Sequence, residues 1–120
     1  MLAHPFRWAH GVGGALARSA DVDGIETMNG RNSDLPNAKA GIVAAERQKA
    51  ATGGSDAHET GSLGRCFSEL EADAETVEEV LALLREGKVH AGGKSQTVGG
   101  RVLVSLSNAR KRVLRGFRAL

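Results

Sequence analysis

Strand-like and helix-like patterns alternate along the middle of this 120-residue chain, and that alternation restricts it to the α/β class. Residues 23–29 have the apolar alternation of a strand, and Asn37 is a plausible N-cap for a helix that runs to about Lys49. Residues 50–58 are a candidate for a short strand that runs into a glycine-rich exit, and residues 65–70 are a further strand candidate. We therefore expect parallel strands flanked by helices.

The clearest helix pattern covers residues 75–87, where apolar side chains recur at i, i+3, i+4 and i+7, namely Val77, Val80, Leu81 and Leu84. Thr76 followed by Glu79 predicts a capping box, and Gly87 predicts the end of the helix. Residues 88–93 and 100–106 are strand candidates on either side of a glycine-rich turn.

Composition excludes several classes of protein. With 41% hydrophobic and 25% charged residues, the chain is too apolar for general disorder. The single cysteine, Cys66, cannot form an internal disulfide, and its neighbour Phe67 suggests ordinary burial. No apolar run reaches the roughly 18–20 residues of a membrane span, and the opening residues lack a signal-peptide pattern. We expect a soluble, cytoplasmic protein without a membrane partner.

Positive charge is concentrated at the C-terminal end. Residues 101–120 hold six basic side chains and no acidic one, within a net charge of +2 for the whole chain. We predict a basic amphipathic helix there, clearest from about residue 108. Its apolar face either docks on the domain, with the arginines solvated, or its arginines bind nucleic acid or polyphosphate.

The stretch "ATGGSDAHE" (residues 51–59) places Asp56 and His58 one residue apart. On a strand these two side chains would project from the same face, and a carboxylate beside an imidazole suits Zn, Mn or Fe. Alternatively, Asp56 caps a turn and His58 is a surface histidine.

A third potential ligand is His4, which precedes Pro5 and therefore suits a strand-to-loop exit. If its strand and the Asp56 strand are neighbours in a parallel sheet, both carboxyl ends open at one edge. The side chains of His4, Asp56 and His58 would then converge.

Four motifs in order now resemble a known family: "AHPFRW" (residues 3–8), "DGIETMNGRN" (23–32), "NAKA" (37–40) and "TGGSDAH" (52–58). Over roughly residues 2–90 the chain is similar to the C-terminal half of PHP-type metal-dependent phosphoesterases. The resemblance implies a distorted β/α barrel, here a partial or half barrel, with two or three divalent metal ions that hydrolyse phosphoesters by metal-activated water.

Carried over motif by motif, the resemblance implies that His4, Asp56 and His58 are metal ligands. Arg7, which follows the "HP" motif, is a candidate contact for a substrate phosphate, or else a surface arginine. The family's sites also use an HxH pair and further ligands upstream of the "HP" motif, and this sequence contains no HxH pair.

Three hypotheses follow for the chain. Residues 1–100 are the C-terminal portion of a PHP-like phosphoesterase, through truncation, a split gene or a misplaced start, with residues 101–120 as a basic helix. Alternatively, the half barrel is a non-catalytic module for interaction or oligomerisation. In the third hypothesis the basic tail makes the chain a nucleic-acid binder. A homo-oligomer or another partner that supplies the missing ligands is compatible with the first.

Overall fold

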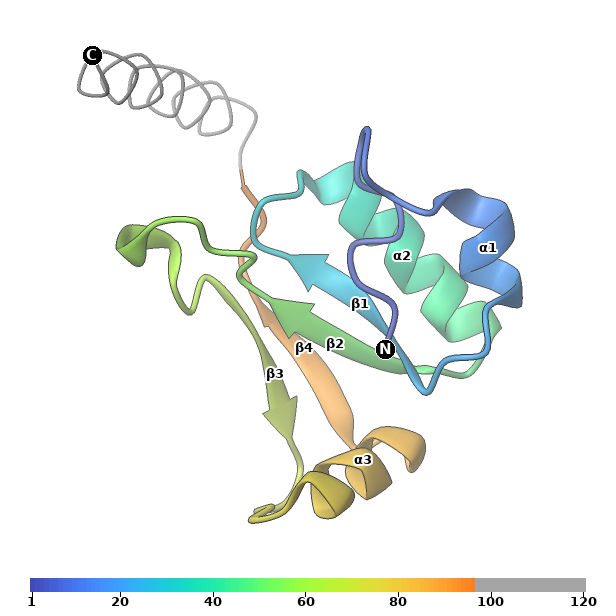
Figure 1. Cartoon of the computed structure of the whole chain (residues 1–120), viewed down its shortest axis with the longest axis vertical. Coiled ribbons are helices and arrows are strands. Elements are labelled where there is room, and N and C mark those ends of the chain that lie inside the picture. The colour runs from blue at the N-terminus through green and yellow to red at the C-terminus, as the bar shows by residue number, and fades with distance from the viewer. Residues whose placement is uncertain (97–120) are drawn as a thin grey trace, which may run out of the picture.

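A computed structural model describes residues 1–96, which form a small α/β unit (Figure 1). In chain order its elements are α1 (Gly13–Ser19), β1 (Gly24–Asn29), α2 (Asp34–Glu46), β2 (Ala50–Gly54), the short 3₁₀ helix η1 (Thr60–Ser62), β3 (Cys66–Leu70), α3 (Val77–Arg85) and β4 (Val89–Gly93). The predicted α/β class is confirmed, whereas the predicted strand at 100–106 and the basic helix at 101–120 lie outside the described residues.

Parallel pairing organises the N-terminal half of the unit. Strand β1 pairs in parallel with β2, and Leu2 forms a parallel bridge with Ile25 of β1. The segment that precedes His4 therefore lies beside β1, and β1 separates it from β2. The His4 and Asp56 segments are therefore not direct neighbours, but their carboxyl ends open at the same edge because all three segments run in one direction.

The second sheet is antiparallel and consists of β3 and β4. Close approach to β2 is possible because Gly53 has no side chain: a Cβ atom there would lie 2.2 Å from the carbonyl oxygen of Phe67. The Ser68 hydroxyl fills the junction, with Oγ 3.0 Å from Gly53 N and 2.9 Å from Gly53 O. The absence of a side chain at Gly53 thus lets β3 of the second sheet pack directly against β2 of the first.

A small aliphatic core lies between α1, α2 and β1. Its buried members are Ala17, Ile25, Ala40, Val43 and Ala44, with Leu2, Phe6 and Val22 packed against them. Figure 1 shows both helices on one side of the β1–β2 pair. No helix within residues 1–96 is long and apolar enough to cross a membrane.

Helix α2 begins earlier than predicted, because Ser33 and not Asn37 is its N-cap. Pro36 is compatible with the first turn, where backbone N–H groups need no partner within the helix, and Asp34 favours the positive end of the helix dipole. The Asn37 side chain is instead bound to the end of β1, 3.2 Å from Asn29 N. At its other end the helix stops at Glu46, before the predicted Lys49.

Helix α1 has no counterpart among the elements predicted from the sequence. Two glycines at its start, Gly13 and Gly14, give it poor intrinsic helix propensity. Tertiary packing compensates, because Ala17 is completely buried in the core.

The α3 prediction is confirmed in detail. Thr76 is the N-cap, its hydroxyl accepts a hydrogen bond from Glu79 N at 3.2 Å, and the Glu79 carboxylate accepts one from Thr76 N at 3.1 Å. These bonds, with a further one from Glu75 N, lower the pKa of Glu79. Gly87 follows the helix with φ +73°, the left-handed conformation that glycine adopts most easily.

Replacing Thr76 with Ala should lower the free energy of unfolding by about 1 kcal/mol, because one N-terminal N–H loses its acceptor. Urea denaturation of the two proteins measures this difference. Thr60→Ala is a useful comparison, since Thr60 is exposed and caps no α-helix. An equal loss in both variants would contradict a specific role for the cap.

Cys66 is 2% exposed, as expected from its sequence context, and burial raises the pKa of its thiol above the ordinary value of 9.0. The thiol of the unfolded chain ionises first as the pH rises. Its contribution to stability is therefore complete below pH 9.0 and is lost as the pH rises through the folded-state pKa. The stability difference between the natural chain and a Cys66→Ala variant should shrink above pH 9.0 in urea titrations, and a constant difference would exclude this linkage.

Candidate functional site

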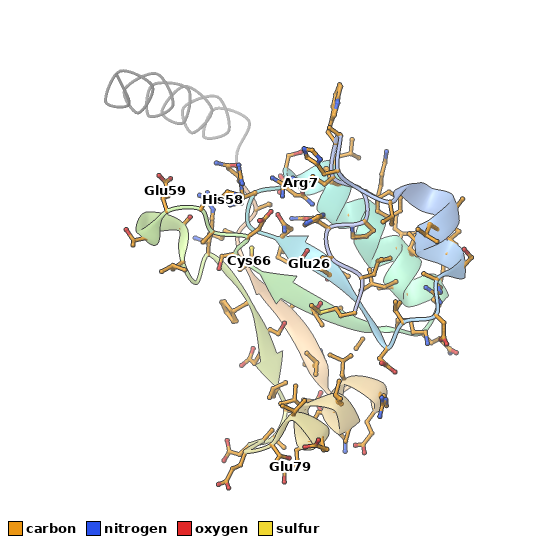
Figure 2. The ribbon with its side chains drawn as sticks, in the orientation of Figure 1. Arg7, Glu26, His58, Glu59, Cys66 and Glu79 are labelled. Carbon is orange, nitrogen blue, oxygen red and sulfur yellow. The ribbon has the colours of Figure 1, made fainter. Side chains whose placement is uncertain are left out.

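Polar side chains gather at the edge where β1 and β2 end. Figure 2 shows Arg7, Glu26 and His58 in this region, whereas Glu79 lies at the opposite end of the molecule. The three residues come from three of the sequence motifs, "AHPFRW", "DGIETMNGRN" and "TGGSDAH". The fold therefore brings distant motifs to one place.

Asp56 and His58 do not lie on a strand, so the prediction that they share a strand face was wrong. Strand β2 ends at Gly54, and Asp56 has a φ of +49° in the loop that follows. His4 also has a positive φ, +27°. Asp tolerates this region better than most residues, and such strain is found most often at functional sites.

The centre of the edge is the carboxylate of Glu26, a strand residue that is only 8% exposed. Its Oε2 accepts hydrogen bonds from His4 N at 2.6 Å and from Asn29 Nδ2 at 3.2 Å. The register of β1 slips between Glu26 and Met28, and such a bulge redirects the side chains that follow it. Asn29 Nδ2 also lies 3.4 Å from Asp56 Oδ2, so one amide joins the two carboxylates.

The fourth motif, "NAKA", joins this network through Asn37. Its side-chain oxygen accepts from Asn29 N at 3.2 Å, and its Nδ2 donates to Asn29 O at 3.1 Å. Close packing of the two loops requires Gly30, where a Cβ atom would lie 2.8 Å from the carbonyl oxygen of Ser55. All four motifs thus meet through one set of buried hydrogen bonds.

Arg7 forms an ion pair with Asp56, and each side chain is 19% exposed. Glu26 and Asp56 carry two negative charges at this edge, and Arg7 and Arg31, whose Nη1 lies 2.8 Å from His58, carry two positive charges. These four charges balance one another. The predicted phosphate contact therefore lies at the site, with a carboxylate as its partner.

His58 contacts both Asp56 and Arg31. Its Nδ1 lies 2.9 Å from the carbonyl oxygen of Asp56, and Arg31 Nη1 lies 2.8 Å from each of the two ring nitrogens. The imidazole therefore lies between a backbone acceptor and a guanidinium donor.

His4 supplies a second available imidazole. Its Nδ1 is buried and has no hydrogen-bond partner within residues 1–96. Two imidazoles and a carboxylate are suitable donors for a borderline divalent ion. In the described part of the chain, however, no three His, Cys, Asp or Glu side chains form a group that could hold a metal ion. The donor types suit a divalent ion, but the described residues do not bring His4, Asp56 and His58 together as one three-ligand group.

Sequence reasoning missed Glu26, although its position carried a signal. Glutamate is depleted in strands, and here it follows the fully buried Ile25. Which face of β1 Glu26 occupies depends on the bulge, which residue spacing does not reveal.

Comparison with known proteins identifies one family. The family described as PHP-associated matches residues 34–89, a range that includes Asn37, Asp56 and His58 but neither His4 nor Arg7. No curated protein and no solved structure matches the chain. The family resemblance inferred from the motifs is confirmed.

Replacing Glu26 with Ala should destabilise the fold by about 2 kcal/mol or more, because His4 N and Asn29 Nδ2 lose a buried acceptor. Glu26→Gln keeps one acceptor oxygen and should cost less. Urea denaturation measures both. Glu69→Ala, at an exposed glutamate of β3, is the matched control and should stay within about 0.5 kcal/mol of the natural chain. Equal effects at Glu26 and Glu69 would show that the buried network contributes little.

Proposed function

Since residues 34–89 belong to the PHP-associated family, we propose that this chain forms part of a PHP-type metal-dependent phosphoesterase. Its fold would be part of a distorted β/α barrel. The parallel segments at Leu2, β1 and β2 would be three neighbouring strands of that barrel. His4, Asp56 and His58 would be its contribution to the metal centre.

One observation carries this proposal: the buried network of Glu26 and Asn29 joins the segments that hold His4 and Asp56. A surface histidine and a turn-capping aspartate need no such connection. Glu26 Oε2 holds the backbone of His4, and Asn29 holds the Asp56 carboxylate. Burying these polar groups costs free energy unless they form hydrogen bonds with one another. Their arrangement therefore supports a site in which the positions of His4 and Asp56 are fixed.

The proposed ligand atoms follow from the hydrogen bonds. They are a ring nitrogen of His58, a carboxylate oxygen of Asp56, and Nδ1 of His4, which has no hydrogen-bond partner within residues 1–96. Zn, Mn or Fe suits this mixture of nitrogen and oxygen donors. Further ligands would come from another polypeptide segment or a partner chain.

A divalent ion at such a centre supplies an activated water as nucleophile and offsets charge on the phosphoryl oxygens. The chain's own residues would orient the reactants. Arg7 would move between Asp56 and a phosphoester oxygen, since a guanidinium fork pairs with either anion. Asn29 would keep the Asp56 carboxylate in place when Arg7 leaves it.

A second candidate function is an interaction or oligomerisation module, which exposed apolar side chains favour. The most exposed of them are Trp8 (85%), Leu63 (69%), Val77 (69%) and Met1 (67%). Exposed apolar side chains mark a contact surface where they form one large contiguous patch. Binding of nucleic acid by residues 101–120 stays a prediction.

Metal content per chain is the decisive measurement. After purification without chelator, the natural chain should retain Zn, Mn or Fe, and an Asp56→Ala/His58→Ala double variant should lose most of it. His10→Ala is the control, because His10 is exposed and lies outside the motifs. Hydrolysis of an aryl phosphate should follow metal content across the three proteins.

Metal at background level in all three proteins, even after incubation with each ion, would contradict the metal site. Metal bound equally by the natural chain and the double variant would contradict these ligands. A stable dimer by light scattering, with no metal bound, would favour the second candidate.

A further inference from the structure

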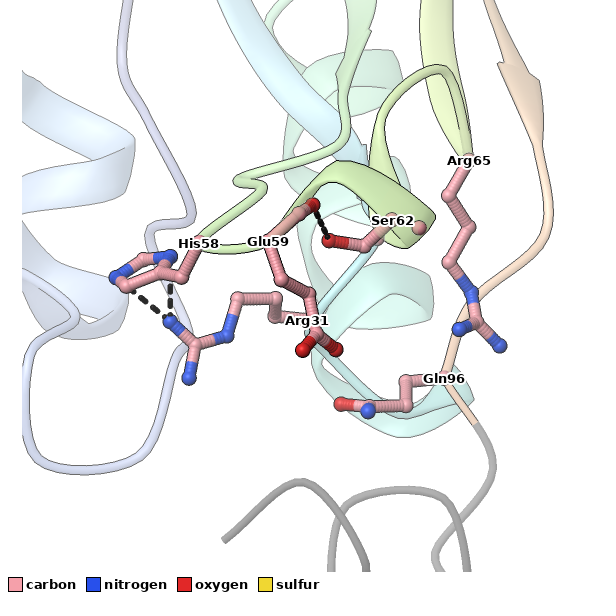
Figure 3. Close-up of a pocket in the computed structure, with 8 residues that line it drawn as sticks. Arg31, His58, Glu59, Ser62, Arg65 and Gln96 are labelled. Carbon is pink, nitrogen blue, oxygen red and sulfur yellow. Dashed lines mark hydrogen bonds between the residues drawn. The ribbon is translucent and has the colours of Figure 1, made fainter. Parts of the chain in front are cut away.

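A small pocket lies directly beside the candidate metal ligands (Figure 3). It has a volume of about 80 Å³, and its principal side chains are those of Arg31, His58, Glu59, Ser62, Arg65 and Gln96. A single water needs about 10–15 Å³, and pockets for whole drug-sized ligands have about 300–1,000 Å³. The space therefore suits a compact group of a few atoms.

Two arginines make this pocket electropositive. Arg31 has its backbone N–H fixed to Asn29 Oδ1 at 3.0 Å, and its Nη1 lies 2.8 Å from His58 Nε2. Arg65 is exposed, and its Nε donates to the carbonyl oxygen of Lys94 at 3.3 Å. The Nη groups of Arg65 have no hydrogen bond within residues 1–96, so they remain available to a ligand.

Gln96 also lines the pocket. The residue is 7% exposed, and its backbone N–H donates to Asn32 O at 2.9 Å. Figure 3 shows its side chain extending into the pocket toward the end of Glu59. The amide N–H groups of Gln96 are donors that a polar occupant of the pocket would accept from.

We propose that this pocket binds a phosphate group. Arg31 and Arg65 would supply positive charge and hydrogen-bond donors, the Gln96 amide a further donor, and the Ser62 hydroxyl a donor at the rim. Glu59 is the acid among the lining residues, and with two arginines the pocket keeps a net positive charge while His58 is neutral.

The position of the pocket indicates a class of substrate, and this inference rests on the proposed function. Arg31 contacts His58, so a phosphate here would lie next to the metal centre without occupying it. The substrate would then be a phosphoester that carries a second phosphate group, held by Arg31 and Arg65 while the first is cleaved. Such a pocket would discriminate against esters with a single phosphate.

The test is a titration of the chelator-treated full chain with inorganic phosphate, followed by ¹⁵N NMR of the glutamine side chains. The chain has two glutamines, and the exposed Gln48 is an internal reference. The Gln96 amide signal, identified by its loss in Gln96→Ala, should shift with saturation, whereas Gln48 should not. Sodium chloride at equal ionic strength controls for screening, and formate tests whether a carboxylate serves equally well.

Arg65→Gln should weaken phosphate binding at least about tenfold, because a charge-assisted hydrogen bond is lost. Arg85→Gln is the matched control: Arg85 is exposed, pairs with Asp23 on the surface, and should bind phosphate as the natural chain does. Glu59→Gln should bind more tightly, since it removes negative charge. An unchanged urea midpoint would show that Arg65→Gln folds normally.

No shift at Gln96 beyond the chloride control would overturn the proposal, as hydration alone then accounts for the pocket. Equal shifts at Gln48 and Gln96, or equal affinity in Arg65→Gln and Arg85→Gln, would also overturn it. Stronger binding of formate would exclude phosphate as the preferred group. Since metal is absent throughout, these results are separate from the metal measurement: phosphate binding can hold where the metal site fails, and the reverse.

Discussion

A buried carboxylate in the middle of a short strand is the constraint on which this edge of the molecule depends. Glu26 is 8% exposed, and an ionised carboxylate is stable there only if donors surround it. The donors to Glu26 are the backbone N–H of His4 and the side-chain amide of Asn29. Satisfying one charge thereby fixes the N-terminal segment against β1 and orients Asn29, which reaches both Asp56 and α2.

Two arginines complete the electrostatics of the edge. Arg7 pairs with Asp56 and Arg31 donates to His58, so each of these two candidate ligands faces a guanidinium from a different motif. Guanidinium groups are donors without acceptor capacity, and they therefore bind phosphate oxygens as readily as carboxylates. The same groups that balance the chain's own carboxylates are suited to receive a phosphorylated molecule.

Much of the fold was predictable from local pattern. The strands at 23–29 and 65–70 and the capped helix α3 form where the residues indicate, because each depends on periodicity or capping within a few residues. The errors arose where tertiary contacts override local preference. Helix α1 forms despite two leading glycines because Ala17 is buried, and Asn37 serves β1 instead of capping α2. Likewise, Asp56 and His58 lie beyond the end of β2, in a loop whose Ser55 packs closely against Gly30.

The sequence by itself determined the α/β class, the resemblance to the PHP family and the choice of His4, Asp56 and His58 as candidate ligands, because residue type, order and spacing carry that information. Only the tertiary structure decided that Glu26 and Asn29 join these segments, that Arg31 contacts His58, and that Arg31, Arg65 and Gln96 share a pocket. These facts depend on hydrogen bonds and contacts between residues up to 65 positions apart, which no local pattern encodes.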